Sequence, residues 1–314
     1  MTRHRLIDLA KVIVTAGLLA AVALTADLRQ IGRTLVAVRW GPLLGALALC
    51  QLGLLVRAYR WQALLDGQGA HVPLRRLLGL YYVGTFYSDF LPTGFGGDAV
   101  RMFELARDGV GGPVAISSVL ADRVLGLLVL LAMALVALPF SAHQVSGAVV
   151  ATLLALAAGS GAGLWLLLDQ RLYAAASRLP WLGRLLRHEK AVALYDSFRF
   201  PPPALARATL ASLAFNISLI LVQVGLARAA GVRIGLGYFL LFVPIISALL
   251  ALPVSVSGFG VREGGYLVLF GQAGVAASQA VAMSLLSYGL NLATGLVGAA
   301  LYLVQGSRSL TAGR

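Results

Sequence analysis

The sequence predicts an all-α polytopic membrane protein, with six full spans and two re-entrant helical hairpins arranged as inverted repeats. Three observations lead to this prediction: an apolar composition, a series of long uncharged runs, and a loop motif that occurs twice. Apolar residues make up 59% of the 314 residues and charged residues only 12%. A soluble domain of this length cannot bury so much apolar surface, so the chain is expected to be a single integral membrane domain over 1–314.

The apolar runs are long enough to serve as membrane spans. A hydrocarbon core about 30 Å thick takes roughly 20 helical residues. In chain order the runs occupy 12–26, 41–56, 124–140, 145–168, 208–227, 236–257 and 264–304. The first run has no convincing small-residue cleavage site and further spans follow it, which favours a membrane helix over a signal peptide.

The distribution of arginine and lysine sets the expected orientation, because positive loop residues stay in the cytoplasm. The N-terminus and the polar, interfacial stretch 169–207 are then cytoplasmic, and the uncharged loop 139–146 is external. These assignments agree only if 77–110 and 236–274 each dip into the membrane and return to the same side. Both termini are then cytoplasmic, and the basic loop 27–40 is external against the rule. The full spans are expected at about 8–26, 41–58, 114–138, 146–168, 208–230 and 276–304.

The two proposed hairpins contain the repeated motif, which reads LPTGFGGDAVR at 91–101 and LPVSVSGFGVRE at 252–263. Proline removes a backbone donor and glycine removes the side chain, so a helix should break at each copy. The residues expected to break or hinge the helices are Pro92, Gly96, Gly97, Pro253, Gly258 and Gly260. Interrupted helices in inverted repeats, here about 41–140 and 208–304, are typical of transporters. The alternative is a chance recurrence in a chain rich in leucine, glycine and valine.

Charged residues follow each helix break. In the first copy Asp98 can cap the new helix, and Arg101 lies three residues further on the same face. In the second copy Arg262 and Glu263 have strongly apolar flanks, where a charge costs roughly 2.5–3.5 kcal/mol. Such an arginine is expected to face an interior cavity, where it can hold a phosphate by two parallel hydrogen bonds. The alternative is that Arg262 and Glu263 neutralise each other.

Two further charged groups are candidates for binding. Arg57 and Arg60 lie three residues apart at the expected cytoplasmic end of a span, with Trp61 at the membrane interface. They are either substrate-binding residues or ordinary anchors of the positive-inside and aromatic-belt kind.

Asp122 and Arg123 start the span after the first hairpin. Adjacent helical residues do not face each other, so this pair is expected to reach across to Arg101 or Asp98. A structural salt-bridge network and a substrate site explain the pattern equally well.

The sequence contains no HExxH, Walker A or Gly-x-Ser-x-Gly pattern, so we expect no catalytic residues, no metal and no cofactor. Its single cysteine, Cys50, excludes an intrachain disulfide and a cysteine metal site. The net charge of +13 is spread over short loops. This favours contact with anionic lipid headgroups over binding to nucleic acid.

Together these residues resemble the flippase-like family related to the transmembrane region of lysylphosphatidylglycerol synthases. The resemblance covers about 40–305 and rests on four groups: Arg57-x-x-Arg60-Trp61, Leu91-Pro92…Gly96-Gly97-Asp98-x-x-Arg101, Asp122-Arg123 with Gly126, and Pro253…Gly258-x-Gly260-x-Arg262-Glu263. In full-length synthases this region is associated with flipping an aminoacylated phospholipid made by an attached synthase domain. The chain ends at Arg314 without that domain, so lysine transfer is not implied. Stand-alone relatives look like transporters or accessory factors for other lipids, including polyprenyl-phosphate sugars and hopanoid-type lipids.

The sequence therefore predicts a lipid flippase of the bacterial inner (plasma) membrane. A lipid headgroup, on a phospholipid, polyprenyl phosphate or hopanoid-type lipid, would enter between the hairpins, with Arg101 and Arg262 on its phosphate. Asp98, Asp122 and Glu263 would hold these arginines or bind a cationic part of the headgroup. One alternative is a membrane transferase, glycosyltransferase-like, with Asp98 and Glu104 as its acid/base couple. Another is a scaffold for a separate lipid-modifying enzyme.

Overall fold

The computed structural model describes residues 15–18, 20, 22–90, 95–141, 143, 145–168, 188–251, 255 and 257–311. Pro92 and Pro253 lie outside the described residues. Within these ranges every regular element is a helix, which confirms the all-α class. The helices are α2 (Leu28–Val36), α3 (Trp40–Gly67), α4 (Leu74–Phe90), α5 (Gly96–Arg107), α6 (Gly112–Ser141), α7 (Gly147–Leu168), α10 (Glu189–Asp196), α11 (Pro202–Ala229), α12 (Leu236–Ala251), α13 (Val261–Gln272) and α14 (Ala277–Thr311).

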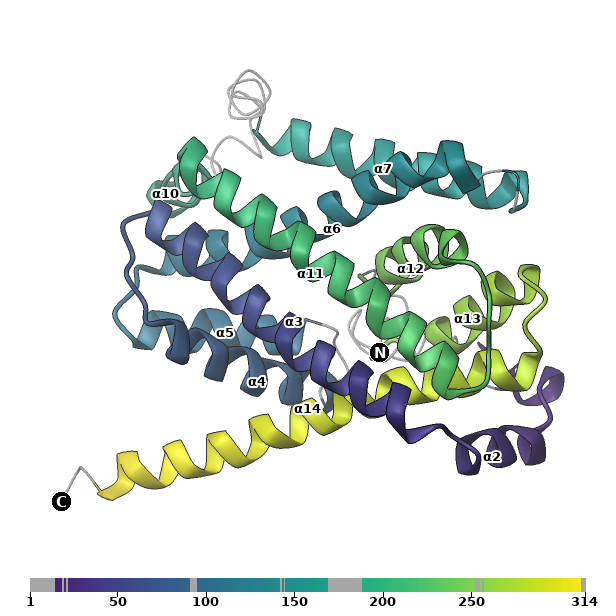
Figure 1. Ribbon diagram of the computed structural model, residues 1–314. Coiled ribbons are helices and arrows are strands. Elements are labelled where there is room, and N and C mark those ends of the chain that lie inside the picture. The colour runs from purple at the N-terminus through teal and green to yellow at the C-terminus, as the bar shows by residue number, and fades with distance from the viewer. Residues whose placement is uncertain are drawn as a thin grey trace, which may run out of the picture.

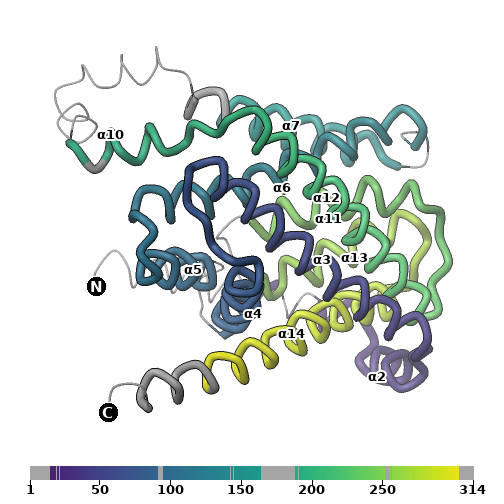
Figure 2. The backbone as a smooth tube through the Cα atoms, turned by 60° about the vertical axis from the view of Figure 1, so that its left-hand side comes forward, coloured from purple at the N-terminus to yellow at the C-terminus, as the bar shows by residue number. Residues whose placement is uncertain are grey.

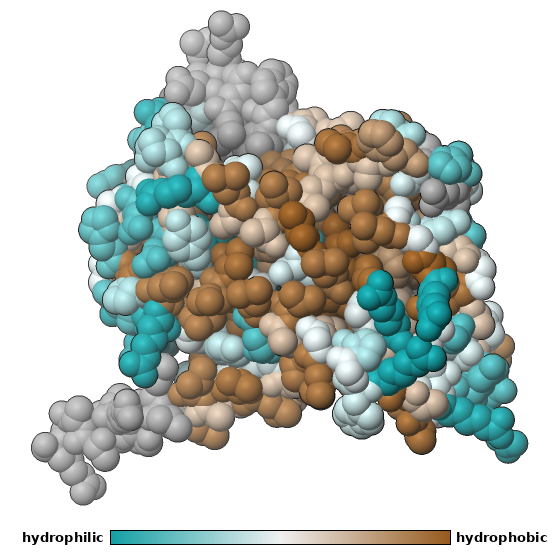
Figure 3. Space-filling view, in the orientation of Figure 1, coloured by the Kyte–Doolittle hydropathy of each residue, from teal (hydrophilic) through white to brown (hydrophobic). Residues whose placement is uncertain are grey.

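Four of the described helices are long and apolar enough to cross a membrane: α3, α6, α11 and the part of α14 at Ala277–Leu303. Each corresponds to one of the six expected spans. The apolar parts of α7 and of the segment 15–25 are shorter. Figure 3 shows apolar side chains across the middle of the face over α3 and α11, with hydrophilic residues at the left edge and lower right. The chain is therefore a multi-pass membrane protein.

Each region expected to form a hairpin consists of two short helices separated by a break. The first pair is α4 and α5, and the second is α12 and α13. Before α13 the backbone takes positive φ at Gly258 and Gly260, 77° and 80°. A side chain is rarely tolerated in this left-handed region, which explains why glycine stands at both positions.

The chain contains two series of four helices of nearly equal lengths. The series α3–α4–α5–α6 has 28, 17, 12 and 30 residues, and α11–α12–α13–α14 has 28, 16, 12 and 35. The first helices of the two series, α3 and α11, pack side by side and antiparallel (Figure 1). At one end of this pair the Arg39 N–H donates to the Ala229 carbonyl, 3.0 Å away, and at the other Gly67 lies against Ala204. The remaining contacts are reciprocal, since α4 packs on α14 and α12 packs on α6 (Figures 1 and 2).

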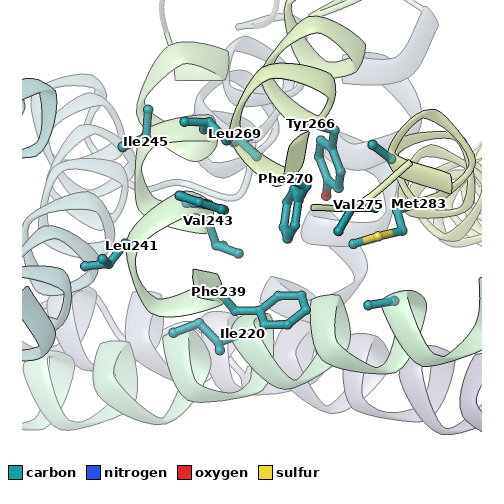
Figure 4. Close-up of a cluster of buried hydrophobic side chains, with 14 of the residues drawn as sticks. Ile220, Phe239, Leu241, Val243, Ile245, Tyr266, Leu269, Phe270, Val275 and Met283 are labelled. Atoms are coloured by element: carbon teal, nitrogen blue, oxygen red, sulfur yellow. The ribbon is translucent and has the colours of Figure 1, made fainter. Parts of the chain in front are cut away.

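The largest buried apolar cluster lies among α11, α12, α13 and α14, with residues from α6 and α7 (Figure 4). Phe270 is at its centre, with its ring centroid 5.4 Å from those of Phe239 and Phe242. Aromatic pairs at this spacing add to the stability gained from burial alone. The cluster fixes the second helix pair to α11 and so positions the break between α12 and α13.

The segment 27–40, expected from the sequence to be an external loop, contains the helix α2. Asp27 caps it, because its Oδ1 accepts a hydrogen bond of 2.8 Å from the Arg29 N–H. Ile31 is buried, and the helix packs on α14. Because Arg39 pairs with Ala229, the exposed Arg228 lies at this same end of the molecule.

Small residues allow α14 to approach the backbone of α4. A Cβ on Gly298 would overlap the Tyr82 carbonyl and lie 2.9 Å from the Val83 nitrogen. Gly298→Ala is expected to destabilise the protein by about 1–3 kcal/mol, because one helix must move. Thermal unfolding of the purified protein in detergent checks this. Gly289→Ala is the matched control, since a Cβ at Gly289 meets nothing within 4 Å, and equal melting temperatures of the two variants would contradict the prediction.

Candidate functional site

A cavity of about 230 Å³ lies between the two broken helix pairs. Its wall comes from α3, α4, α5, α6, α12, α13 and α14 and from described residues at both breaks. Both copies of the repeated motif reach it, the first through Gly97 and Arg101 and the second through Gly258 and Arg262. The predicted residues that line the cavity are Arg57, Gly97, Asp98, Arg101, Arg123, Gly258 and Arg262.

Asp122 is the centre of a buried ion network next to the cavity. Its carboxylate is 0% exposed and accepts hydrogen bonds at Oδ1 from Arg60 Nε at 2.6 Å and at Oδ2 from Arg101 Nη2 at 3.2 Å. The Tyr81 hydroxyl also donates to Oδ2. The expected reach across to Arg101 is confirmed. Arg60 further donates to the Ser212 hydroxyl of α11, so the network joins the two helix series.

Asp98 pairs with two arginines of the cavity wall, Arg101 and Arg123. Its Oδ1 accepts a bond of 3.3 Å from Arg101 Nη1, and its Oδ2 pairs with Arg123 Nε. Arg101 also stacks against aromatic rings, 3.8 Å from the centroid of Tyr81 and 4.1 Å from that of Trp61. Arg101 is therefore held on several sides at once.

Trp61, expected at the membrane interface, is not part of an exposed aromatic belt. Trp61 is 0% exposed, and its indole N–H donates to the Ser118 hydroxyl at 3.1 Å. An aromatic belt needs exposed rings, but α4, α5 and α6 cover this part of α3. Arg60, at 2% exposure, is equally unsuited to anchoring at the surface, and neither residue lines the cavity.

Glu263 is a helix cap and does not pair with Arg262. Its Oε2 accepts a hydrogen bond of 2.6 Å from the Gly260 N–H at the start of α13, and its Oε1 accepts one of 3.3 Å from Ser284. A carboxylate in the first turn satisfies a free N–H and interacts favourably with the helix dipole. The alternative in which Arg262 and Glu263 neutralise each other does not occur.

Arg262 and Arg57 form no ion pair within the part of the chain that the structure describes. Arg262 is 9% exposed, and its Nη1 is buried with no hydrogen-bond partner there. Its guanidinium lies 5.2 Å from the centroid of the Tyr288 ring. Arg57 likewise has a buried, unpartnered Nε, between the rings of Tyr81 and Phe215. Neither forms an ion pair with a described carboxylate.

Several residues of the cavity were not among the sequence candidates. Asp89, at the end of α4, lines the cavity, as do Thr85, Ser88 and Asn291. The signal for Asp89 was available, since a lone acid in a long apolar run marks a functional position by default. The polar but uncharged residues carry no comparable signal. In the described ranges no group of three histidine, cysteine or acidic residues is placed to hold a metal ion.

The model of the lysylphosphatidylglycerol synthase TM region matches residues 9–298. The chain belongs to this family. The match spans both broken helix pairs and all the arginines of the cavity, and it connects this family member with membrane lipids. No curated protein matches the chain.

Proposed function

We propose that this family member is a lipid flippase that moves a lipid with a phosphate-bearing headgroup across the bilayer. The observation that carries the proposal is the buried Arg262, whose Nη1 points to no partner among the described residues and which lines a polar cavity. An unpaired charge inside a membrane protein is costly, so such a residue usually serves a ligand. A phosphate is the anion whose geometry suits a guanidinium.

Arg57 supplies the second positive charge in this proposal. Arg101, the residue expected from the sequence, already has Asp98 and Asp122 as partners. Arg57 lines the same cavity and has no described ion-pair partner. Arg101 and Arg123 then shape the wall of the cavity, and Asp98 and Asp122 position them.

The proposed architecture is six full spans and two re-entrant hairpins in inverted repeats. Matched helix lengths, the antiparallel pair α3 and α11, and the reciprocal contacts of α4 with α14 and α12 with α6 support it. Rocking of one repeat against the other would open the cavity alternately to each side. We place the protein in the bacterial inner membrane with both termini in the cytoplasm.

Transport fits the site better than catalysis by the carboxylate couple considered for a transferase. Asp98 is taken up by Arg101 and Arg123. Glu104 lies outside the cavity wall and pairs with Arg76 at 3.0 Å and Arg107 at 3.2 Å. Acid/base work needs a carboxylate that can reach a substrate in the proper protonation state.

Translocation of fluorescent phosphatidylglycerol in proteoliposomes tests the proposal. Wild-type protein is expected to expose inner-leaflet label to an external quencher. Arg262→Ala should slow this by about 10–100-fold, since a hydrogen bond to a charged group contributes about 1.5–3 kcal/mol. Arg207→Ala is the control, because Arg207 is exposed and outside the cavity. Equal rates for wild type and Arg262→Ala would overturn the site.

A further inference from the structure

Asp89 is the acid of the cavity wall that has no ion pair among the described residues. The other acid in the wall, Asp98, is paired with arginines. The Oδ2 atom of Asp89 is buried without a hydrogen-bond partner in the described ranges. Asp89 interacts electrostatically with Arg262, the arginine that also lacks a partner. Asp89 and Arg262, neither of them in an ion pair among the described residues, therefore share the cavity.

One carboxylate oxygen of Asp89 packs against α14. Its Oδ2 lies 2.9 Å from where a Cβ on Gly295 of α14 would be, so the missing side chain leaves room for the carboxylate. The Cα atom of Phe86, also in α4, lies 3.3 Å from the same Cβ position on Gly295. The Asp89 carboxylate therefore lies between α4 and α14, in the wall of the cavity.

From these contacts we infer that Asp89 competes with the lipid phosphate for Arg262 and takes up a proton when the lipid binds. The inference rests on the proposed function, because it assigns the coupling ion of the same site. When the cavity is empty, the Asp89 carboxylate is the counter-charge of Arg262. When a phosphodiester binds to Arg262 and Arg57, the Asp89 carboxylate loses its counter-charge and lies beside a second anion, which favours the protonated acid. One proton moves from solvent to an Asp89 oxygen, and the charge of the cavity is conserved.

Asp89 takes this proton because the groups around it are uncharged, already paired, or arginines. The elements packed on α4 are α14, α5 and α3. Along the cavity wall α14 presents the uncharged Asn291, and α5 presents Asp98 and Arg101, which are paired to each other. The remaining charged groups of the wall are arginines: Arg57 of α3, Arg123 of α6 and Arg262 of α13. On α4 itself, the Tyr81 and Tyr82 hydroxyls donate to Asp122 and Gln51, and the Tyr87 ring packs on Tyr302.

The consequence is a direction for transport. Lipid and proton enter the cavity together on the acidic side of the membrane. On the alkaline side Asp89 loses its proton, regains Arg262 as its counter-ion and displaces the phosphate. A proton gradient would then drive accumulation of the lipid in one leaflet.

Calorimetric titration of the protein in phosphatidylcholine nanodiscs tests the coupling. The probe is 1-oleoyl-lysophosphatidylglycerol, whose phosphodiester keeps one negative charge between pH 5 and pH 8, and empty nanodiscs give the baseline. Wild-type affinity is expected to fall as pH rises, by up to about tenfold per pH unit, because one proton is linked to binding. Titrations in two buffers of different ionisation enthalpy should show about one proton taken up. Asp89→Asn should bind with no pH dependence and no proton uptake.

Asp196→Asn is the matched control, because Asp196 is 54% exposed on α10 and far from the cavity wall. It should keep the wild-type pH dependence. Wild-type binding that is independent of pH would overturn the coupling and leave the flippase proposal standing. A wild-type pH dependence retained in Asp89→Asn would also overturn it. Absence of wild-type binding at every pH would overturn both proposals.

A parallel titration with the zwitterionic 1-oleoyl-lysophosphatidylethanolamine separates another role of Asp89. If Asp89→Asn weakens binding of this probe alone, and the phosphatidylglycerol probe shows no proton uptake, Asp89 binds a headgroup amine and the coupling is wrong.

Discussion

Replacing Asp122 with alanine is expected to destabilise the protein by about 3–5 kcal/mol. The substitution removes the carboxylate that Arg60 and Arg101 share, and both arginines are only 2% exposed. The Arg60 guanidinium would then keep its charge without a counter-ion, and Arg101 would keep only Asp98. The loss would affect the whole fold, because Arg60 connects α3 to α6 and α11 through this network.

Thermal unfolding in detergent measures the effect. Asp122→Asn should be less damaging than Asp122→Ala, because the amide oxygen can still accept from the Tyr81 hydroxyl. Asp196→Ala should leave the melting temperature nearly unchanged, since exposed ion pairs contribute about 0–1 kcal/mol. Melting of Asp122→Ala at the wild-type temperature would show that the network adds nothing to stability.

The second large effect is expected at Gly97. A Cβ at this position would overlap the carbonyl oxygen of Gly84 and the hydroxyl of Ser88. Because the obstacle includes backbone of α4, the contact cannot be relieved by a rotamer change. Gly97→Ala should cost about 3 kcal/mol, the upper end for overpacking. It should also slow lipid translocation, because α5 carries Asp98 and Arg101 into the cavity wall.

The prediction separates stability from function. Melting of Gly97→Ala should be lower than that of Gly112→Ala, where a Cβ meets nothing within 4 Å. In proteoliposomes, equal amounts of folded protein should show slower translocation for Gly97→Ala alone. Wild-type melting and translocation of Gly97→Ala would contradict the prediction, because they would mean that α4 and α5 can move apart without loss of stability or function.

Much of the helical framework follows from local sequence. Helices end near each copy of the repeated motif because glycine adopts conformations that helices exclude, as at Gly258 and Gly260. The pairing of Asp122 with Arg101 also followed, since a charge in an apolar run needs a partner from another segment. Helix α2 does not follow from the charge of the loop 27–40, because its formation depends on the amphipathic pattern of Leu28–Val36.

The roles of individual charges did not follow from sequence spacing. Glu263 was expected near the ligand, yet it caps α13 through the Gly260 N–H. Trp61 is of a residue type that is common at membrane interfaces, but α4, α5 and α6 bury it. Arg101 and Arg262 are equivalent in the repeated motif, and only Arg101 has carboxylate partners among the described residues.

The sequence by itself determined that this is an all-α membrane protein of the lysylphosphatidylglycerol synthase TM region family, with two interrupted helix pairs. These properties depend on apolar run length and on proline and glycine, which act within a few residues of their own positions. Only the tertiary structure decided which arginines are neutralised and that Asp89 shares the cavity with Arg262. Charge compensation depends on distances between segments far apart in the chain, and helix packing alone sets those distances.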